Sequence, residues 1–500
     1  MADVEEQARL PEAPPEPHSI YTPAQKSLIV LLVSVAATFS GFASNIYFPS
    51  IPTIASNLSV SVEAVNLTVT GYLIFQGLSP TLWGAVSDTY GRRVTYICTF
   101  VVFIGACVGL ALTKDYAQLL VLRCLQSTGS ASTIAIGAGV VGDITVREER
   151  GGYMGWFQAG LLLPTAVGPL IGGAIADSLG WRAIFWFLTI YGGAFLIFLI
   201  VLLPETLRTL VGNGSIPPKG LAKSVLAYLQ RRRSVSQRDI QLSATAGPTQ
   251  KGQSKATDAS QPAQPSPKKK IDILGTLRIL LQFQATFAIV FIGIYYMVWQ
   301  MVLTILSTLF KSTYQMSDLQ IGLVYIANGV GCMVGTALTG KFLDWDYRRI
   351  KKQYAQNPDE FPLEQARLRT VWVYGPVQCA SVLVFGWTLD KDVHVSVPII
   401  CLFFLGWTAI SIQSTVATFL VDIYPDRSAS ATAALNLARC LLGAAGTAAV
   451  SPCVKAMGVG WTMTLFTAIM AACAGLIVVQ LVCGPAWRRR REIMSQQPKP

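Results

Sequence analysis

The feature that most constrains this sequence is a pattern that occurs twice. Four residues recur with identical internal spacing 256 positions later: Gly84, Asp88, Arg92 and Arg93 in the first copy, and Gly340, Asp344, Arg348 and Arg349 in the second. In both copies the pattern follows a long apolar segment that carries almost no charge. The sequence therefore predicts a duplicated protein whose halves share one arrangement of helices.

Apolar segments long enough to cross a bilayer recur along the whole chain. The sequence is 52% hydrophobic and 13% charged, and about 20 apolar residues suffice to span the hydrocarbon core as a helix. We expect an all-α integral membrane protein with twelve transmembrane helices in two pseudo-symmetric six-helix bundles. The predicted spans are 27–48, 64–86, 94–113, 118–142, 151–176, 183–204, 284–310, 318–343, 369–389, 395–421, 428–450 and 459–484.

The apolar pattern divides the chain into five regions. Residues 27–204 and 284–484 are the predicted bundles, joined by a largely disordered loop at 205–283 and flanked by a disordered tail at 1–26 and a basic tail at 485–500. Within the loop, residues 237–267 are rich in Gln, Ser, Ala, Pro and Thr, and such a composition cannot bury a core. The sequence leaves open whether Ser234, which follows three arginines, is phosphorylated and whether Asn57 is glycosylated.

Positive charge accumulates on one side of the predicted membrane topology. Basic residues follow the second, fourth, eighth, tenth and twelfth spans, whereas the opposite loops carry isolated cations. By the positive-inside rule, both tails and the central loop are cytoplasmic. The net charge of +12 flanks spans instead of covering a soluble face, so we expect no nucleic-acid partner. The plasma membrane is the expected location, with the vacuolar membrane as the alternative.

Residues that catalyse reactions or bind metals are scarce. The two histidines, His18 and His394, lie outside the spans, and the ten cysteines lie in or at the ends of spans, where a thiol behaves as a small apolar group. Neither a metal-ligand spacing nor a disulfide framework is present. We therefore expect no catalytic residue, no metal and no cofactor.

The segment 84–93, GAVSDTYGRR, forms a short connection between the second and third spans. It resembles the signature loop of the major facilitator superfamily. In that family the Asp touches a helix across the domain interface, and the first Arg pairs with an acid that ends the fourth span. The resemblance implies gating roles for Asp88, Arg92 and Asp143. The internal repeat extends the inference to a second set, Asp344, Arg348 and Asp422.

A second motif lies in the fifth span. Gly168, Pro169, Gly172 and Gly173 resemble the antiporter signature of the superfamily, although Pro164 replaces its leading Gly. Proline and glycine bend a helix and let it pack closely against a neighbour. The motif favours export.

Segments in the first, second and eleventh spans narrow the resemblance. With SNIYFP at 44–49 and SASATAALNLARCLLGAAG at 428–446, the chain resembles the fungal drug:proton antiporter family of twelve spans. The nearest resemblance is to the branch that holds quinidine-resistance transporters and citrate exporters.

Two arginines lie inside predicted spans. Insertion of an arginine at the centre of a membrane helix costs about 2.5–3.5 kcal/mol, and the spans contain Arg123 and Arg439 but no Asp or Glu away from their cytoplasmic ends. Arg123 resembles the superfamily's fourth-span arginine, with snorkelling to the interface as the alternative. We expect a positive cavity, and arginine grips carboxylates through two parallel hydrogen bonds. The candidate neutral contacts, each of which could equally be an interhelical hydrogen bond, are Asn45, Gln76, Gln300, Asn328, Gln413 and Asn436.

These observations predict a monomeric transporter that works by alternating access and exports an organic anion, such as a citrate-like carboxylate or an acidic metabolite. A proton-coupled multidrug efflux antiporter is the alternative, and a nutrient-sensing receptor built on the same fold is a third reading. The coupling stays open: a proton carried by Asp143, Asp422 or the substrate, or the membrane voltage alone, could drive export.

Overall fold

The computed structural model describes residues 19–214, 216, 279–354, 362–424 and 428–496. Ser234, most of the predicted central loop, residues 1–18 and residues 497–500 lie outside the described residues. Every regular element among the described residues is a helix. This confirms the all-α prediction.

The first bundle contains six helices of 20 residues or more: α1 (Pro23–Asn45), α3 (Val62–Tyr90), α4 (Arg92–Ala111), α5 (Tyr116–Ile144), α6 (Arg147–Leu179) and α7 (Arg182–Leu202). Three short helices accompany them: η1 (Phe48–Ser50), α2 (Ile51–Asn57) and α8 (Arg208–Val211).

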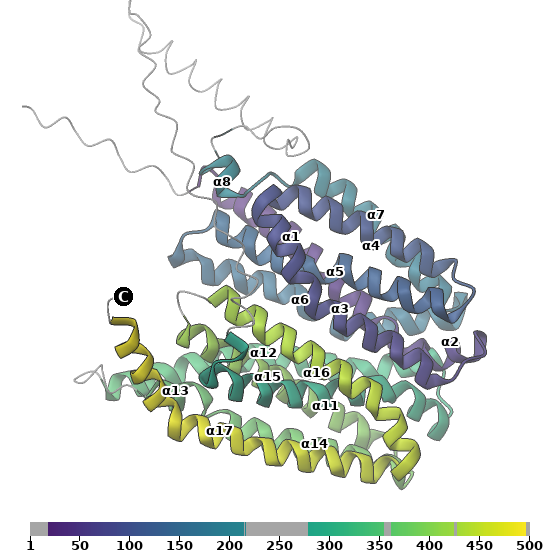
Figure 1. The fold of residues 1–500 in the computed structure, drawn as a ribbon. Coiled ribbons are helices and arrows are strands. Elements are labelled where there is room, and N and C mark those ends of the chain that lie inside the picture. Colours follow the sequence, from purple (N-terminus) through teal and green to yellow (C-terminus); the bar gives the residue numbers. More distant parts are fainter. Residues whose placement is uncertain (1–18, 215, 217–278, 355–361, 425–427, 497–500) are drawn as a thin grey trace, which may run out of the picture.

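The second bundle repeats the arrangement with α11 (Phe283–Thr313), α12 (Asp318–Gln353), α14 (Val371–Asp390), α15 (Ser396–Ile423), α16 (Ser428–Met457) and α17 (Val459–Gln496), and with the short α13 (Leu363–Leu368) before α14. The two bundles lie one above the other in Figure 1. Equivalent helices pair in each: α3 with α5 as α12 with α15, α1 with α6 as α11 with α16, and α4 with α7 as α14 with α17. The predicted duplication is therefore also a duplication of packing.

Eleven segments of the described chain are long and apolar enough to cross a membrane. The twelfth long helix, α3, falls short of that composition. Its polar residues include Asn66 and Thr70, whose side chains hydrogen-bond to α16 in the other bundle. A helix whose polar side chains lie at an interhelical interface has a lower mean hydropathy than one that faces lipid.

Two helix pairs hold the bundles together, α6 with α12 and α3 with α16. The α6–α12 pair approaches at the level of the backbone, because a Cβ atom added to Gly173 would overlap the carbonyl oxygen of Asp318 and one added to Gly329 would overlap the backbone of Ala166. Within the first bundle, a Cβ on Gly172 would overlap the carbonyl oxygen of Ile46. Gly172 and Gly173 of the predicted antiporter motif thus occupy positions where only a hydrogen atom fits, whereas a Cβ on Gly168 would make ordinary contacts at 3.6 Å.

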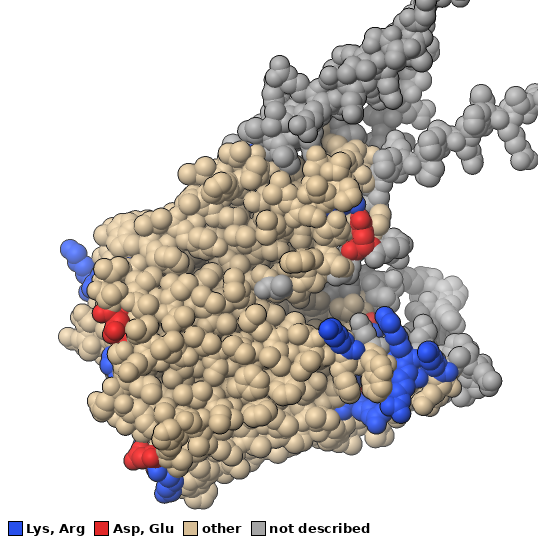
Figure 2. Space-filling view, turned by 180° about the vertical axis from the view of Figure 1, so that it is seen from behind, with Lys and Arg blue, Asp and Glu red and all other residues tan. Residues whose placement is uncertain are grey.

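The molecule has two distinct ends. Figure 1 places α8, α13 and the last turns of α17 at one end, called here the α8 end, and α2 at the other, called the α2 end. On the face seen in Figure 2, charged side chains gather at these two ends and leave an uncharged band between them, as expected for a bilayer-spanning protein.

Candidate functional site

Arg439 lies near the middle of α16 in a cluster of neutral partners. Its Nη2 and Nε donate to Oδ1 of Asn436 at 2.8 and 3.1 Å, and its Nη1 donates to Oε1 of Gln413 at 3.1 Å. The guanidinium carbon lies 4.9 Å from the centre of the Tyr296 ring. No carboxylate pairs with Arg439 among the described residues. The cluster therefore keeps its positive charge.

The Arg439 cluster touches the opposite bundle. Nδ2 of Asn436 donates to the carbonyl oxygen of Gln76 at 3.4 Å, and the thiol of Cys440 lies 4.0 Å from Oε1 of Gln76. Four of the eight predicted binding residues thus come together at the bundle interface: Gln76, Gln413, Asn436 and Arg439. Asn436 and Arg439 are partly exposed.

Arg123, in α5, is fully buried, which excludes snorkelling. Its Nη1 donates to the carbonyl oxygen of Ala43 at 2.9 Å and to Oε1 of Gln126 at 2.6 Å, while Nε and Nη2 have no hydrogen-bond acceptor. The guanidinium lies between two rings, 4.4 Å from the centre of Tyr47 and 4.6 Å from that of Tyr72. Cation–π contacts of this kind stabilise a desolvated guanidinium by about 2 kcal/mol.

Each arginine lies against aromatic side chains of its own bundle. Tyr47 and Tyr72 face Arg123 in the first bundle, and Tyr296 faces Arg439 in the second. Each bundle therefore contributes one guanidinium that is held by aromatic rings.

The other three predicted contacts lie elsewhere. Asn45 donates to the carbonyl oxygen of Gly41 in its own helix, and Oδ1 of the buried Asn328 accepts from the indole of Trp299 at 2.9 Å. Gln300 is buried on α11, where its side chain packs toward Gly443 of α16. Asn328 thus makes an interhelical hydrogen bond, which is the alternative to a substrate contact given above.

Sequence reasoning left the partners of the arginines unassigned. Gln126 lies three residues after Arg123, and this spacing places both on one helical face, so it could have been found. Tyr47, Tyr72 and Tyr296 come from other helices, and nothing in the spacing of the sequence pairs them with either arginine.

The signature loop lies at the α8 end. Nε of Arg92 donates to Oδ2 of Asp143 at 2.9 Å, and its Nη1 donates to Oδ1 of Asp88 at 2.6 Å. The Asp88 side chain is 63% exposed and pairs within its own loop, so the contact across the interface that the family resemblance implies is not made in this structure.

A buried carboxylate accepts hydrogen bonds from the end of this loop. Glu205 is 2% exposed and accepts hydrogen bonds from the backbone N–H groups of Arg92 and Arg93, the first residues of α4. A carboxylate at a helix N-terminus is favoured by the helix dipole. The Tyr21 hydroxyl donates to the Glu205 carbonyl oxygen, and burial, with the Glu205 charge nearby, raises the pKa of Tyr21 to about 12, so this hydroxyl keeps its proton.

The second copy of the loop differs from the prediction. Asp422 pairs with Arg367 of α13 at 2.7 Å, whereas Arg348 is exposed; the expected pairing of Arg348 with Asp422 is wrong. In the first copy Gly91 breaks the helix with φ of 112°, but the equivalent position is Tyr347, and α12 continues to Gln353. Arg348 is carried along that helix, and the side chain of Asp344 lies outside the described residues.

A second group of interactions joins the bundles at the α2 end. The Asp318 carboxylate, 5% exposed at the start of α12, accepts from the Thr53 hydroxyl at 2.7 Å and from Nζ of Lys311 at 3.0 Å. The expectation that all acids near the spans lie at the opposite end is therefore wrong for Asp318. In the sequence Asp318 follows a polar turn, and nothing there indicates that α2 covers it.

Hydrogen bonds between α3 and α16 continue from the α2 end to mid-depth. They join Glu63 to Lys455 at 2.7 Å, Asn66 to Ser451 at 2.8 Å, Thr70 to Thr447 at 2.9 Å and Gln76 to Asn436 at 3.4 Å. The bond between Gln76 and Asn436 is the one of these four that lies nearest the α8 end. Together they hold the two bundles against each other from the α2 end to mid-depth.

Comparisons with known proteins agree with this architecture. A family model described as Major Facilitator Superfamily matches residues 33–447. The chain is 38% identical to citrate exporter 1 of Aspergillus niger, over 95% of this chain and 89% of the relative, and 35% identical to the MFS antiporter QDR2 of Candida albicans, over 90% and 87%. The solved xylose transporter XylE from E. coli shares the fold with a TM-score of 0.63 at 14% identity, over 91% of this chain and 97% of that one.

Proposed function

This chain belongs to the Major Facilitator Superfamily, and we propose that it exports a citrate-like organic anion by alternating access. The observation that carries the proposal is the Arg439 cluster, a cationic group at the bundle interface whose hydrogen-bond partners are all neutral. A relative named as a citrate exporter supports this substrate class, and another is named as an MFS antiporter.

The chemistry of the cluster favours an anion. Asn436 and Gln413 orient the guanidinium of Arg439 but leave its charge uncompensated, and a cation held in a low-dielectric site attracts a counter-charge strongly. A substrate carboxylate supplies that charge and fits the fork of N–H donors. In Arg123, Nε and Nη2 are free to donate, so a substrate with two or three carboxylates has a second partner when Tyr72 moves aside.

The multidrug alternative has a specific observation in its favour. Three tyrosines, Tyr47, Tyr72 and Tyr296, lie against the two arginines, and aromatic faces bind lipophilic cations. Against it, the buried acid between the bundles, Asp318, is already engaged by Lys311. A lipophilic cation would thus enter a region of positive charge without an available carboxylate.

In this proposal the α8 end faces the cytoplasm, which the positive charge there favours. The bonds that join the bundles from the α2 end to mid-depth support a state closed toward the outside, in which cytoplasmic substrate would reach Arg439 from the α8 end. With the cytoplasm negative, each exported negative charge gains about 2.3 kcal/mol per 100 mV.

The proposed energy source is the membrane voltage, and the proposed location is the plasma membrane. Asp143 lies with Arg92 at the α8 end, away from Arg439, so the membrane voltage, rather than a proton carried by Asp143, drives export in this proposal. We place the protein in the plasma membrane as a monomer, with both tails in the cytoplasm.

Uptake into inside-out vesicles tests the proposal. Radiolabelled citrate and a lipophilic cation are compared under imposed voltage and pH gradients, for the wild type, Arg439→Gln and the charge-matched control Lys114→Gln, which alters an exposed residue between α4 and α5. Citrate accumulation that responds to voltage, survives in Lys114→Gln and is lost in Arg439→Gln is expected. Accumulation of the cation that is indifferent to Arg439 would overturn the proposal in favour of multidrug efflux.

A further inference from the structure

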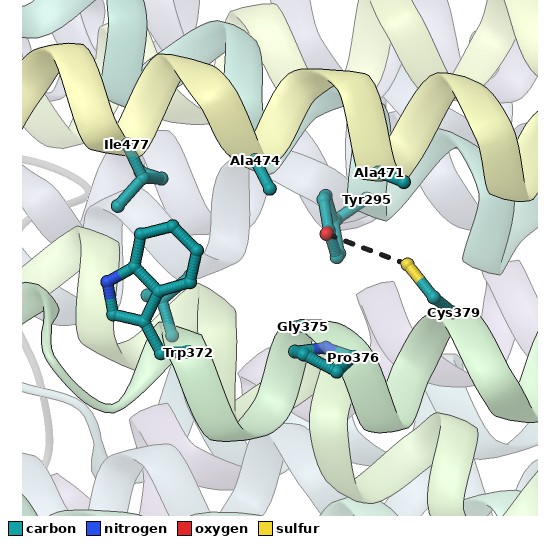
Figure 3. A pocket seen from close by; sticks show the side chains of 9 residues that line it. Tyr295, Trp372, Gly375, Pro376, Cys379, Ala471, Ala474 and Ile477 are labelled. Carbon is teal, nitrogen blue, oxygen red and sulfur yellow. Dashed lines mark hydrogen bonds between the residues drawn. The ribbon is translucent and has the colours of Figure 1, made fainter.

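A cavity of about 300 Å³ lies in the second bundle, away from the Arg439 cluster. It lies between α11, α14 and α17 and is lined mainly by apolar side chains. Figure 3 shows Trp372 and Ile477 at one end of it and Ala471 and Cys379 at the other, with Tyr295 behind. None of the predicted substrate contacts lines this cavity.

Small residues create the empty space. Ala471 and Ala474 on α17 face Gly375 and Pro376 on α14, so neither helix sends a large side chain into the middle. The one hydroxyl in the wall is already satisfied, since Tyr295 donates to the carbonyl oxygen of Met470 at 3.3 Å and lies 3.8 Å from the Cys379 sulfur. A cavity without unsatisfied polar groups stays dry and accepts apolar guests.

The cavity lies on the side of the bundle that faces lipid. In the apolar stretch of α17 only 22% of the residues are buried inside the protein, against 83% in α11. Trp372, at the rim, is 43% exposed. The lining residues of α14 are in its first half, which starts at the α8 end. An apolar guest therefore enters from the bilayer leaflet at that end.

The rim of the cavity carries positive charge at headgroup level. The Arg369 side chain is exposed, and its carbonyl oxygen accepts the backbone N–H of Trp372 at 3.2 Å, which places Arg369 one turn from the rim. Trp487 stacks on Phe287 at the same end, with ring centres 5.6 Å apart, and such aromatic residues mark the membrane interface. Figure 2 shows further basic side chains gathered at this end of the second bundle. This charge suits an anionic headgroup.

We propose that the space between α14 and α17 is a lipid-binding site that takes an acyl chain of an anionic phospholipid, with the headgroup at Arg369. The chain fills the cavity beside Pro376 and Ala474, and the lipid phosphate and carboxylate lie in the interface near Trp372. The site is separate from the substrate path and does not depend on the identity of the exported molecule. Bound lipid would wedge α14 against α17.

Photolabelling of the full chain in nanodiscs tests the proposal. The probe is phosphatidylserine with a diazirine in one acyl chain, compared with the phosphatidylcholine analogue, and labelled peptides are located by mass spectrometry. We expect label concentrated on residues 372–379 and 471–477, stronger for phosphatidylserine. Ala474→Phe, which fills the cavity, should abolish this concentration, and Arg369→Gln should remove the preference for phosphatidylserine.

The matched control is Ala472→Phe, which adds the same ring to an exposed position of α17 outside the cavity lining. Its labelling should equal that of the wild type. Label spread evenly over lipid-facing helices, or label unchanged by Ala474→Phe in protein with a wild-type melting temperature, would overturn the site. Equal labelling by the two lipids would overturn the role of Arg369. If Ala474→Phe fails to fold, displacement of the probe by unlabelled phosphatidylserine decides between a saturable site and bulk lipid.

Discussion

The hydroxyl of Thr53 donates a 2.7 Å hydrogen bond to Oδ2 of Asp318, which joins α2 of one bundle to the first turn of α12 in the other. Nζ of Lys311 completes the group by donating to both side chains, at 2.9 and 3.0 Å. These bonds exist only while the α2 ends lie together, so they stabilise one state of the transporter over the other.

Loss of the Thr53 bond should open the α2 end. A hydrogen bond to a charged group contributes about 1.5–3 kcal/mol, so Thr53→Val should raise the ratio of open to closed α2 ends by roughly tenfold or more. Spin labels attached at positions 57 and 315 report the distance between the two bundles at the α2 end by electron paramagnetic resonance. Ser56→Ala, an exposed change in the same helix, is the control, and equal distance distributions for the two variants would contradict the prediction.

A carboxylate introduced beside Arg439 should pair with its guanidinium in place of the substrate carboxylate. In Gln413→Glu the new acid takes the place of the Oε1 acceptor 3.1 Å from the guanidinium and neutralises it. We expect citrate binding to fall by at least about tenfold, because a paired arginine loses its attraction for a second anion, while the melting temperature is unchanged or raised. Gln315→Glu, which adds the same acid at an exposed position between α11 and α12, is the control and should bind citrate as the wild type does. Isothermal titration measures both. Undiminished affinity in Gln413→Glu would count against Arg439 as the anion ligand.

Arg123 should be dispensable for folding but not for transport. Replacement of a buried charge by an apolar side chain of similar volume is often neutral or stabilising, so Arg123→Met should retain or raise the melting temperature while it abolishes transport. Thermal unfolding and vesicle uptake on the same preparation separate the two effects. A variant that transports normally would show that the Tyr47–Arg123–Tyr72 stack is structural.

The ion pair of Asp422 gives a test of the corrected pairing. The side chains of Arg367 and Asp422 are 11% and 29% exposed, so Arg367→Gln should destabilise the protein by about 1–3 kcal/mol. Arg348→Gln changes an exposed residue and should stay within about 0.5 kcal/mol of the wild type. Denaturation in detergent measures both. The reverse order of stabilities would restore the pairing expected from the repeat.

Gly91 should be among the least replaceable residues of the signature loop. Its φ of 112° is rarely adopted by other residues, and a Cβ there would lie 2.5 Å from Oε2 of Glu205. Gly91→Ala should therefore lower the melting temperature clearly, by an amount that corresponds to about 1–3 kcal/mol. Gly84→Ala, whose Cβ would meet no atom within 4 Å, should be silent, and comparable losses in both variants would contradict the argument.

Much of the fold and part of the site follow from the sequence. Residue types at Gly84 to Arg93 identified the loop, and the pairing of Arg92 with Asp143 is as expected. The second loop has Tyr347 where the first loop has Gly91. This difference is visible in the sequence, but the repeated residues around it favoured an equivalent loop. Gln76, Gln413, Asn436 and Arg439 stand out in the sequence as polar residues in apolar spans, but Asn45 and Asn328 stand out by the same criterion.

The helices, the duplication and the two cations within the membrane follow from the sequence alone. A helix in lipid satisfies its backbone within its own segment, so apolar length and turn residues are enough to predict it. The packing of the helices is needed to see that Tyr296 lies against Arg439, that Arg367 rather than Arg348 reaches Asp422, and that Thr53 covers Asp318. Those contacts depend on how each helix rotates and how closely its small residues let the next one approach, which no single segment encodes.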